Sequence, residues 1–224
     1  MRKIFNFIVI TILANSAIGA SAQVKTDTLP LLRGLRVELD VLSPLMHSLG
    51  GSDGYYFQGA VAVSLREQYF PTLEVGFGGV DNKISASGQG FSTNGVFARV
   101  GMDYAMLKSR NKSLNYNLFV VGARLGFSPF SYDVSNVSVG DNYWNATSPV
   151  VRDYNNETTL RLWYEILVGI RVEVIHNVFM GWNVRTKGLF GNDNKGKIYP
   201  YYIPGFGNFK GSHWEFNYTV GYQF

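Results

Sequence analysis

Apolar and polar side chains alternate with a period of two in eight segments of the chain. The last segment, residues 214–224, has Trp, Phe, Tyr, Val, Tyr and Phe at every second position, with Glu, Asn, Thr, Gly and Gln between them. Such alternation predicts a β-strand with one apolar face. The other seven segments are 34–42, 57–65, 72–79, 96–104, 119–127, 161–173 and 178–187. Helical periodicity of comparable regularity is found nowhere after residue 22, so the pattern predicts an all-β fold.

The connections between these strands alternate in length. The shorter ones are around 66–70, 105–118 and 175–177, and the longer ones are 43–56, 80–95, 128–160 and 188–212. A short–long rhythm is typical of outer-membrane barrels, and the segments are near the 9–11 residues that a tilted spanning strand needs. We therefore expect an eight-stranded antiparallel up-and-down transmembrane β-barrel with short periplasmic turns and long extracellular loops.

The charged residues of the strands all lie on the polar face, seven basic and seven acidic. They are Arg36, Glu38, Asp40, Glu74, Arg99, Asp103, Arg124, Arg161, Glu165, Arg171, Glu173, Arg185, Lys187 and Glu215. In a soluble sandwich or lipocalin these charges would face water, but eight aromatic-rich strands would then overfill a small interior. If the apolar face meets lipid instead, the charges point inward and must pair. We expect a salt-bridged interior without an open solute pore, because eight strands enclose only enough room for their own side chains.

The first residues predict export. Arg2 and Lys3 precede an apolar run that ends at a small-residue cleavage site, Ala20 to Ala22. We expect a cleaved signal peptide at 1–22, a periplasmic segment at 23–33 and the barrel at 34–224. Loss of Arg2 and Lys3 reduces the net charge from +4 to about +2, which does not favour a nucleic-acid partner. The chain has no cysteine, so disulfides and thiolate metal sites are excluded.

The last residues, YTVGYQF, resemble the C-terminal assembly signal of bacterial outer-membrane barrels. The resemblance implies that Tyr222 and Phe224 face outward and are read by the barrel-assembly machinery, although the usual glycine of that signal lies further upstream than Gly221. The segments GLRVELD, VGMDY, GARLGFSPFSYD, GIRVEV and YYIPGFG resemble a domain-of-unknown-function family of small outer-membrane β-barrels, OmpA/OmpX-like in architecture. This resemblance implies a fold and a location but no activity.

Candidate chemistry is sparse. His47 and His213 are expected at the same outer rim as Ser43, and a Ser/His pair at such a rim is found in some outer-membrane acyl hydrolases and acyltransferases. No nucleophile motif accompanies them and no metal-ligand or cofactor spacing appears, so we expect neither an enzyme nor a cofactor. The aromatic loops 199–209 and 128–160 are expected to anchor the barrel among lipid headgroups, or to bind a ligand or partner.

These patterns lead to one expected function and two alternatives. The expectation is a monomeric protein of the bacterial outer membrane, in contact with lipopolysaccharide and phospholipid, with a structural or surface-interaction role through its external loops. The first alternative is a small transport or ligand-binding barrel for an apolar molecule that passes a lateral opening. The second is a lipid-modifying enzyme that uses His213 or His47.

Overall fold

The computed structural model describes residues 32–49, 54–66, 68–84, 88–106, 118–139, 150–191, 199–209 and 214–224. The predicted signal peptide, and the predicted periplasmic segment up to residue 31, lie outside these ranges. The elements are β1 (Leu32–Asp40), α2 (Leu42–Ser48), β2 (Tyr55–Leu65), β3 (Tyr69–Ile84), β4 (Gly90–Ala105), β5 (Leu118–Val139), β6 (Val150–Ile175), β7 (Val178–Leu189), β8 (Tyr202–Ile203), β9 (Gly207–Asn208) and β10 (Trp214–Gln223).

Eight of these strands form one antiparallel sheet that closes on itself. The order around the ring is β1-β10-β7-β6-β5-β4-β3-β2, and β2 returns to β1. Each predicted strand overlaps one strand of the ring, so the expected eight-stranded antiparallel sheet is confirmed. The first strand begins at Leu32 rather than at residue 34, and the short β8 and β9 pair only with each other.

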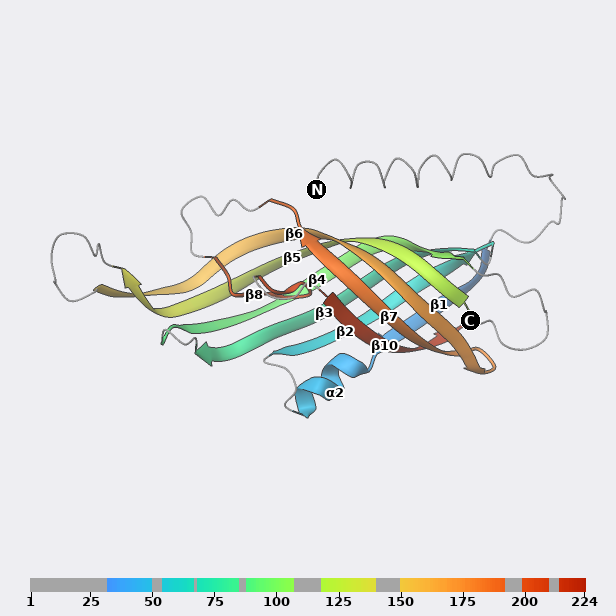
Figure 1. The fold of residues 1–224 in the computed structure, drawn as a ribbon, viewed down its shortest axis with the longest axis horizontal. Coiled ribbons are helices and arrows are strands. Elements are labelled where there is room, and N and C mark those ends of the chain that lie inside the picture. The colour runs from blue at the N-terminus through green and yellow to red at the C-terminus, as the bar shows by residue number, and fades with distance from the viewer. Residues whose placement is uncertain are drawn as a thin grey trace. The chain divides into compact units, whose positions relative to one another are not determined.

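The ring is uneven because four neighbouring strands are much longer than the rest. The register between β1 and β10 covers only Arg36↔Gln223 to Asp40↔Thr219, whereas that between β5 and β6 runs from Leu118↔Arg171 to Val139↔Val150. Strands β3 to β6 therefore continue as an open four-stranded extension past the ends of β7, β10, β1 and β2 (Figure 1). The predicted long loops at 80–95 and 128–160 are wrong, since most of these residues are in paired strands.

A change of phase in the alternation explains that error. In β5 the outer face carries the odd-numbered apolar residues from Phe119 to Phe127, whereas Phe130, Tyr132 and Val134 are even-numbered and buried on the inner face. The predicted strand therefore ends at Phe127, because the prediction followed one continuous apolar face and the apolar residues then move to the other face. The strand itself continues, because its backbone hydrogen bonds to β4 and β6 do not depend on which face is apolar.

The outer face of the ring is apolar and the inner face is polar. Along β6 the side chains from Leu160 to Ile170 alternate between exposed apolar residues and buried ones. Ile166 is 51% exposed, while the preceding Glu165 is 1% exposed. This is the reverse of the arrangement that a soluble protein adopts, in which charged side chains face water.

Helix α2 begins at Leu42, the last residue of the predicted strand 34–42, and continues into the predicted loop 43–56; it lies beside β2 and β10 (Figure 1). The carboxylate of Asp40 initiates the helix, since its Oδ1 accepts the Leu42 N–H at 3.1 Å and its Oδ2 accepts the Ser43 hydroxyl at 2.6 Å. Pro44 in the first turn has no N–H to satisfy and suits that position. At seven residues the helix is too short to show a repeating apolar stripe, which is why periodicity missed it. No helix among the described residues is long and apolar enough to cross a membrane.

Candidate functional site

The interior of the ring holds a network of ion pairs to which seven of the eight strands contribute. Its members are Arg36 and Glu38 on β1, Glu74 on β3, Arg99 and Asp103 on β4, Arg124 on β5, Glu165 and Arg171 on β6, Arg185 and Lys187 on β7, and Glu215 on β10. The eighth strand, β2, adds Tyr56 and Gln58, which hydrogen-bond to Arg99. The closed sheet therefore encloses a buried salt-bridge network, as expected from the balanced charges.

Glu74 is at the centre of the network. Its Oε1 lies 3.0 Å from Nε of Arg124, and its Oε2 lies 2.9 Å from Nη1 of Arg185 and 3.1 Å from Nη1 of Arg99. The residue is buried, so three cations neutralise one carboxylate in a region that water reaches poorly. The three arginines come from β4, β5 and β7, and β7 is adjacent to neither of the other two strands in the sheet.

Towards the turns between β2 and β3 and between β6 and β7, a second group of charges continues the chain of pairs. Asp103 accepts from Arg124 and from Arg171, both at 2.6 Å, and Arg171 also lies 3.2 Å from Glu38. Arg36 pairs with Glu38 at 2.7 Å, and its guanidinium stacks 4.9 Å from the centre of the Phe70 ring. The buried side chains of Phe70, Ala105, Leu118 and Val120 form an apolar cluster next to Arg36 at this end of the interior.

The other charged residues that were predicted to face the interior lie around this network of ion pairs. The Oδ2 atom of Asp40 accepts from the side-chain amides of Asn217 at 3.0 Å and Gln58 at 3.2 Å. Arg161 is buried, and Glu173 is half-buried, with its Oε1 accepting the Asn177 N–H at 3.0 Å. Sequence reasoning missed the uncharged members Tyr56 and Asn217, although the same alternation puts both on the charged face.

The opposite end of the interior is closed by residues 199–209. Ile203, Pro204, Gly205 and Phe206 form a turn in which the Phe206 N–H donates to the Ile203 carbonyl at 3.0 Å, and Gly205 has φ +81°. A type II turn requires a positive φ at its third residue and favours proline at its second, so the Pro-Gly pair specifies it. The Pro-Gly pair therefore indicates a turn from the sequence alone, but it does not indicate that the turn folds inward.

Two cations hold this turn inside the ring. The Gly205 carbonyl accepts from Arg99 Nη2 at 2.6 Å and from Lys187 Nζ at 2.7 Å. Phe206 packs edge-on against Trp163, which is fully buried and donates its indole N–H to Glu165 at 2.6 Å.

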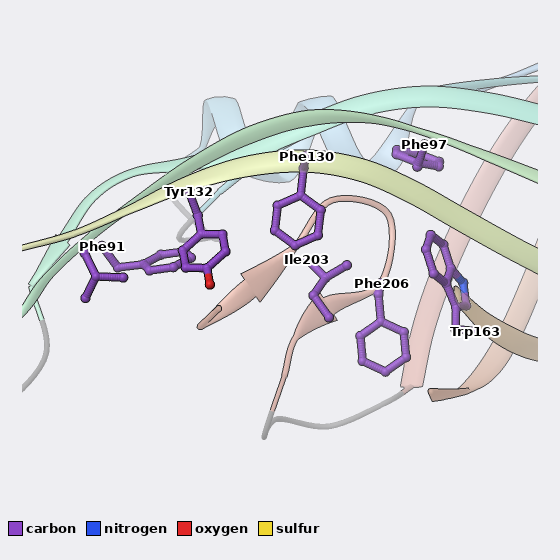
Figure 2. Close-up of a cluster of buried hydrophobic side chains, with 8 residues drawn as sticks. Phe91, Phe97, Phe130, Tyr132, Trp163, Ile203 and Phe206 are labelled. Carbon is purple, nitrogen blue, oxygen red and sulfur yellow. The ribbon is translucent and has the colours of Figure 1, made fainter. Parts of the chain in front are cut away.

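The turn is embedded in an aromatic cluster rather than in a lipid headgroup region. Figure 2 shows Ile203 and Phe206 of the turn among the cluster side chains of β4, β5 and β6: Phe91, Phe97, Phe130, Tyr132 and Trp163. Val134 of β5 belongs to the same cluster. The prediction that segment 199–209 anchors at the headgroups is wrong for Ile203 and Phe206, which are buried. Tyr199 and Tyr201 remain exposed. The same correction applies to Phe130 and Tyr132 of the predicted 128–160 loop, while Tyr143 and Trp144 lie outside the described residues.

Among the described residues, the wall of the ring is interrupted where β1 ends. Strand β1 ends at Asp40, and only the Val41 N–H bond to the Tyr218 carbonyl at 2.9 Å continues its pairing with β10. Beyond that bond, no described strand pairs with the β1-facing edge of β10 at Trp214 to Asn217. On the other side, β2 from Tyr55 to Gln58 pairs with β3 alone. Helix α2 lies at this break.

A cavity of about 320 Å³ occupies the break. Helix α2 contributes Leu42, Ser43 and Met46 to its lining, β10 contributes Trp214, Glu215 and Phe216, and the interior contributes Tyr56, Lys187 and Phe206 together with residues of the β8–β9 hairpin. Burial, together with the nearby charge of Glu215, raises the pKa of the Tyr202 phenol, so this lining hydroxyl stays protonated and neutral.

Of the candidate catalytic residues, Ser43 lines this cavity and His47 lies on the same helix, but the structure shows no hydrogen bond between them. The Ser43 hydroxyl donates to Asp40, and the exposed His47 ring lies edge-on to Tyr55 with 6.1 Å between centroids. His213 lies outside the described residues. No group of three or more His, Asp or Glu side chains that could hold a metal ion occurs in the part of the chain that the structure describes.

The two aromatic residues of the predicted assembly signal both face outward. Tyr222 and Phe224 are exposed and pack edge-on with 4.9 Å between their ring centroids. The Phe224 N–H donates to the Leu35 carbonyl at 2.8 Å, so the last residue of the chain takes part in closing the ring.

The fold and the interior define a class: closed eight-stranded antiparallel sheets that are apolar outside and ion-paired inside. The chain belongs to the family described as a domain of unknown function (DUF6048), whose model matches residues 1–224. No curated protein matches the chain.

Proposed function

We propose that this protein is an integral β-barrel of the bacterial outer membrane, without a solute pore, that carries a rigid extension for contacts at the cell surface. The observation that carries the proposal is where the apolar outer face ends on the side of the extension, which is called its upper edge below. On β3 to β6 this edge consists of Phe77, Val96, Pro129 and Leu160, which the strand registers place in one row across the sheet. The next outward row is Gly79, Asn94, Ser131 and Thr158.

On each of these four strands the apolar outer face therefore has a defined end, as it would at the edge of a bilayer. On β4 the outer face is apolar from Val96 to Tyr104, eight steps of about 3.4 Å, or about 27 Å along the strand. At the tilt of roughly 40° usual for such barrels, this corresponds to about 21 Å along the membrane normal, close to the apolar band of about 25 Å that outer-membrane barrels present. Tyr104 and its partner Tyr69, with ring centroids 5.4 Å apart, mark the lower edge as an aromatic girdle would.

The filled interior favours a role outside it. The ion pairs and the inward-folded turn occupy the space through which a solute would pass, and moving them would separate buried charges. Lipopolysaccharide and phospholipid would contact the apolar outer face. Within this proposal, strands β3 to β6 extend beyond the membrane on the side opposite to the C-terminal residue Phe224.

The extension has the features of a defined surface rather than of loose loops. Asn136 and Asn156 both have a positive φ at interruptions of the β5–β6 register. Their N–H groups donate across the hairpin, from Asn136 to Asp153 at 2.9 Å and from Asn156 to Asp133 at 2.6 Å. Such bulges twist a sheet and make its edges less prone to uncontrolled pairing. The structure therefore supports surface interaction better than transport.

Two arginine substitutions on the same strand test the placement. Val168 lies in the middle of the apolar outer face of β6, and Val151 lies on the extension; both are exposed. In a bilayer, Val168→Arg should cost about 2–4 kcal/mol and lower the membrane-inserted yield, whereas Val151→Arg should cost little. Insertion is measured by the heat-modifiable band of the folded protein in washed outer membranes.

In a water-soluble protein the two substitutions should change the yield of folded protein equally, because both valines would already face solvent. Equal yields of the two variants would therefore contradict the membrane placement. So would a purified chain that stays monodisperse in buffer without detergent. A surface role predicts in addition that removing the tip of the β5–β6 hairpin leaves insertion unchanged.

A further inference from the structure

The break in the wall connects the interior of the ring with its apolar outer surface. Trp214 and Phe216 point outward and are more than half exposed, while Glu215 between them points inward, yet all three line the cavity. Tyr56 and Lys187, both on inward-facing positions, line it as well. A cavity bounded by both faces of the same strand passes through the wall.

The charged groups in the lining are already neutralised. Lys187 pairs with Glu215, and its ammonium also donates to the Gly205 carbonyl at 2.7 Å and to the Phe206 carbonyl at 3.2 Å, so its three donors are used. The other oxygen of Glu215 accepts the Asn217 amide at 2.7 Å. A ligand with a charged headgroup would find no counter-charge here and would lose its hydration without compensation.

The uncharged polar lining and the apolar mouth are complementary to the two ends of an amphiphile. Tyr202 and Asn208 carry hydroxyl and amide groups that can exchange hydrogen bonds with a neutral headgroup. Towards the outside, the lining is Leu42, Met46, Trp214 and Phe216.

We propose that the cavity binds one amphiphile with a single acyl chain and an uncharged, hydroxyl-bearing headgroup, which enters from the bilayer between α2 and β10. The headgroup would lie against Tyr202 and Asn208, and the chain would leave past Met46 and Phe216. A volume of about 320 Å³ is at the lower end of the range for ligand sites, roughly 300–1,000 Å³, and suits a small headgroup with the first part of one chain. The entry route from the bilayer rests on the membrane placement proposed above.

A photoactivatable monoacylglycerol with the reactive group in its acyl chain tests this site. The full chain is reconstituted in phosphatidylcholine nanodiscs, and cross-linked residues are identified by mass spectrometry. We expect saturable cross-linking at residues 42–46 and 214–216. Unlabelled monoolein should displace the probe at a concentration about tenfold lower than oleate, which has the same chain but a charged headgroup.

Two variants of neighbouring helix residues separate binding in the cavity from general contact with lipid. Met46→Trp fills the mouth and should weaken probe binding at least about tenfold. Leu45→Trp introduces the same side chain on a residue that does not line the cavity, and should leave binding unchanged. Equal binding by both variants, equal competition by oleate and monoolein, or unsaturable labelling over the whole outer face would each overturn the proposal.

Failure of this site is distinguishable from failure of the membrane placement. The insertion test with Val168→Arg and Val151→Arg does not involve the cavity. A chain that inserts as expected but shows no saturable labelling would retain its membrane placement and lose the amphiphile site.

Discussion

Replacing Glu74 with glutamine removes the central negative charge of the interior while keeping the shape of the side chain. Three arginines then lose a shared counter-ion in a region where each is almost completely buried. The main effect should be on the stability of the ring rather than on its fold, because the backbone register does not depend on this carboxylate.

The size of the effect follows from what each arginine retains. Arg124 keeps Asp103 at 2.6 Å, while Arg99 and Arg185 keep Glu165 at 2.8 and 2.9 Å. Breaking a buried ion pair by removing one partner costs about 3–5 kcal/mol, and the remaining partners favour the lower value, about 3 kcal/mol. Against a total stability of roughly 5–15 kcal/mol, such a loss is readily measured.

The measurement is urea unfolding of the protein folded in detergent micelles, followed by tryptophan fluorescence and by the heat-modifiable gel band. Asp81→Asn is the control, because Asp81 is an exposed carboxylate on the same strand, and its loss should change the free energy of unfolding by less than about 0.5 kcal/mol. The double variant Glu74→Gln/Arg185→Gln removes one charge of each sign. It should be less destabilised than the sum of the two single variants.

Either of two results would refute this reasoning. If Glu74→Gln cost no more than Asp81→Asn, charge pairing would not be what stabilises the interior. If the double variant were as unstable as the sum of the single variants, Glu74 and Arg185 would not be energetically coupled, despite their 2.9 Å contact.

Two further predictions concern packing and assembly. Gly126→Ala should destabilise the protein by about 1–3 kcal/mol in the same urea assay, because a methyl group there would lie 2.5 Å from Nε1 of the buried Trp163. Gly59→Ala is its control and should be tolerated, since the nearest atom is Cδ2 of the flexible Leu39 side chain at 3.3 Å; equal losses would argue against the Trp163 packing. Deleting Phe224 should slow the appearance of the heat-modifiable folded band, and Phe224→Trp should not; unchanged kinetics on deletion would show that the terminal aromatic is not an assembly signal.

Much of the fold was predictable because the period of a β-strand is a local property. The eight strands and the face on which Glu74 or Arg99 lies follow from alternation alone, since a strand gives each side chain only two directions. The restriction of strand charges to one face, in equal numbers of each sign, then indicated an ion-paired interior. What alternation did not reveal was the upper extension, because the apolar face changes sides between Phe127 and Phe130.

The sequence by itself determined which side chains share a face, and thereby that this molecule is apolar outside and ionic inside. Only the tertiary structure decided which charges meet, that the Ile203–Phe206 turn folds into the ring, and that the wall breaks where β1 ends. These features depend on the register and length of strands far apart in the chain. The Arg99 guanidinium and the Gly205 carbonyl, for example, lie 2.6 Å apart because the turn folds into the ring, which no local pattern predicts.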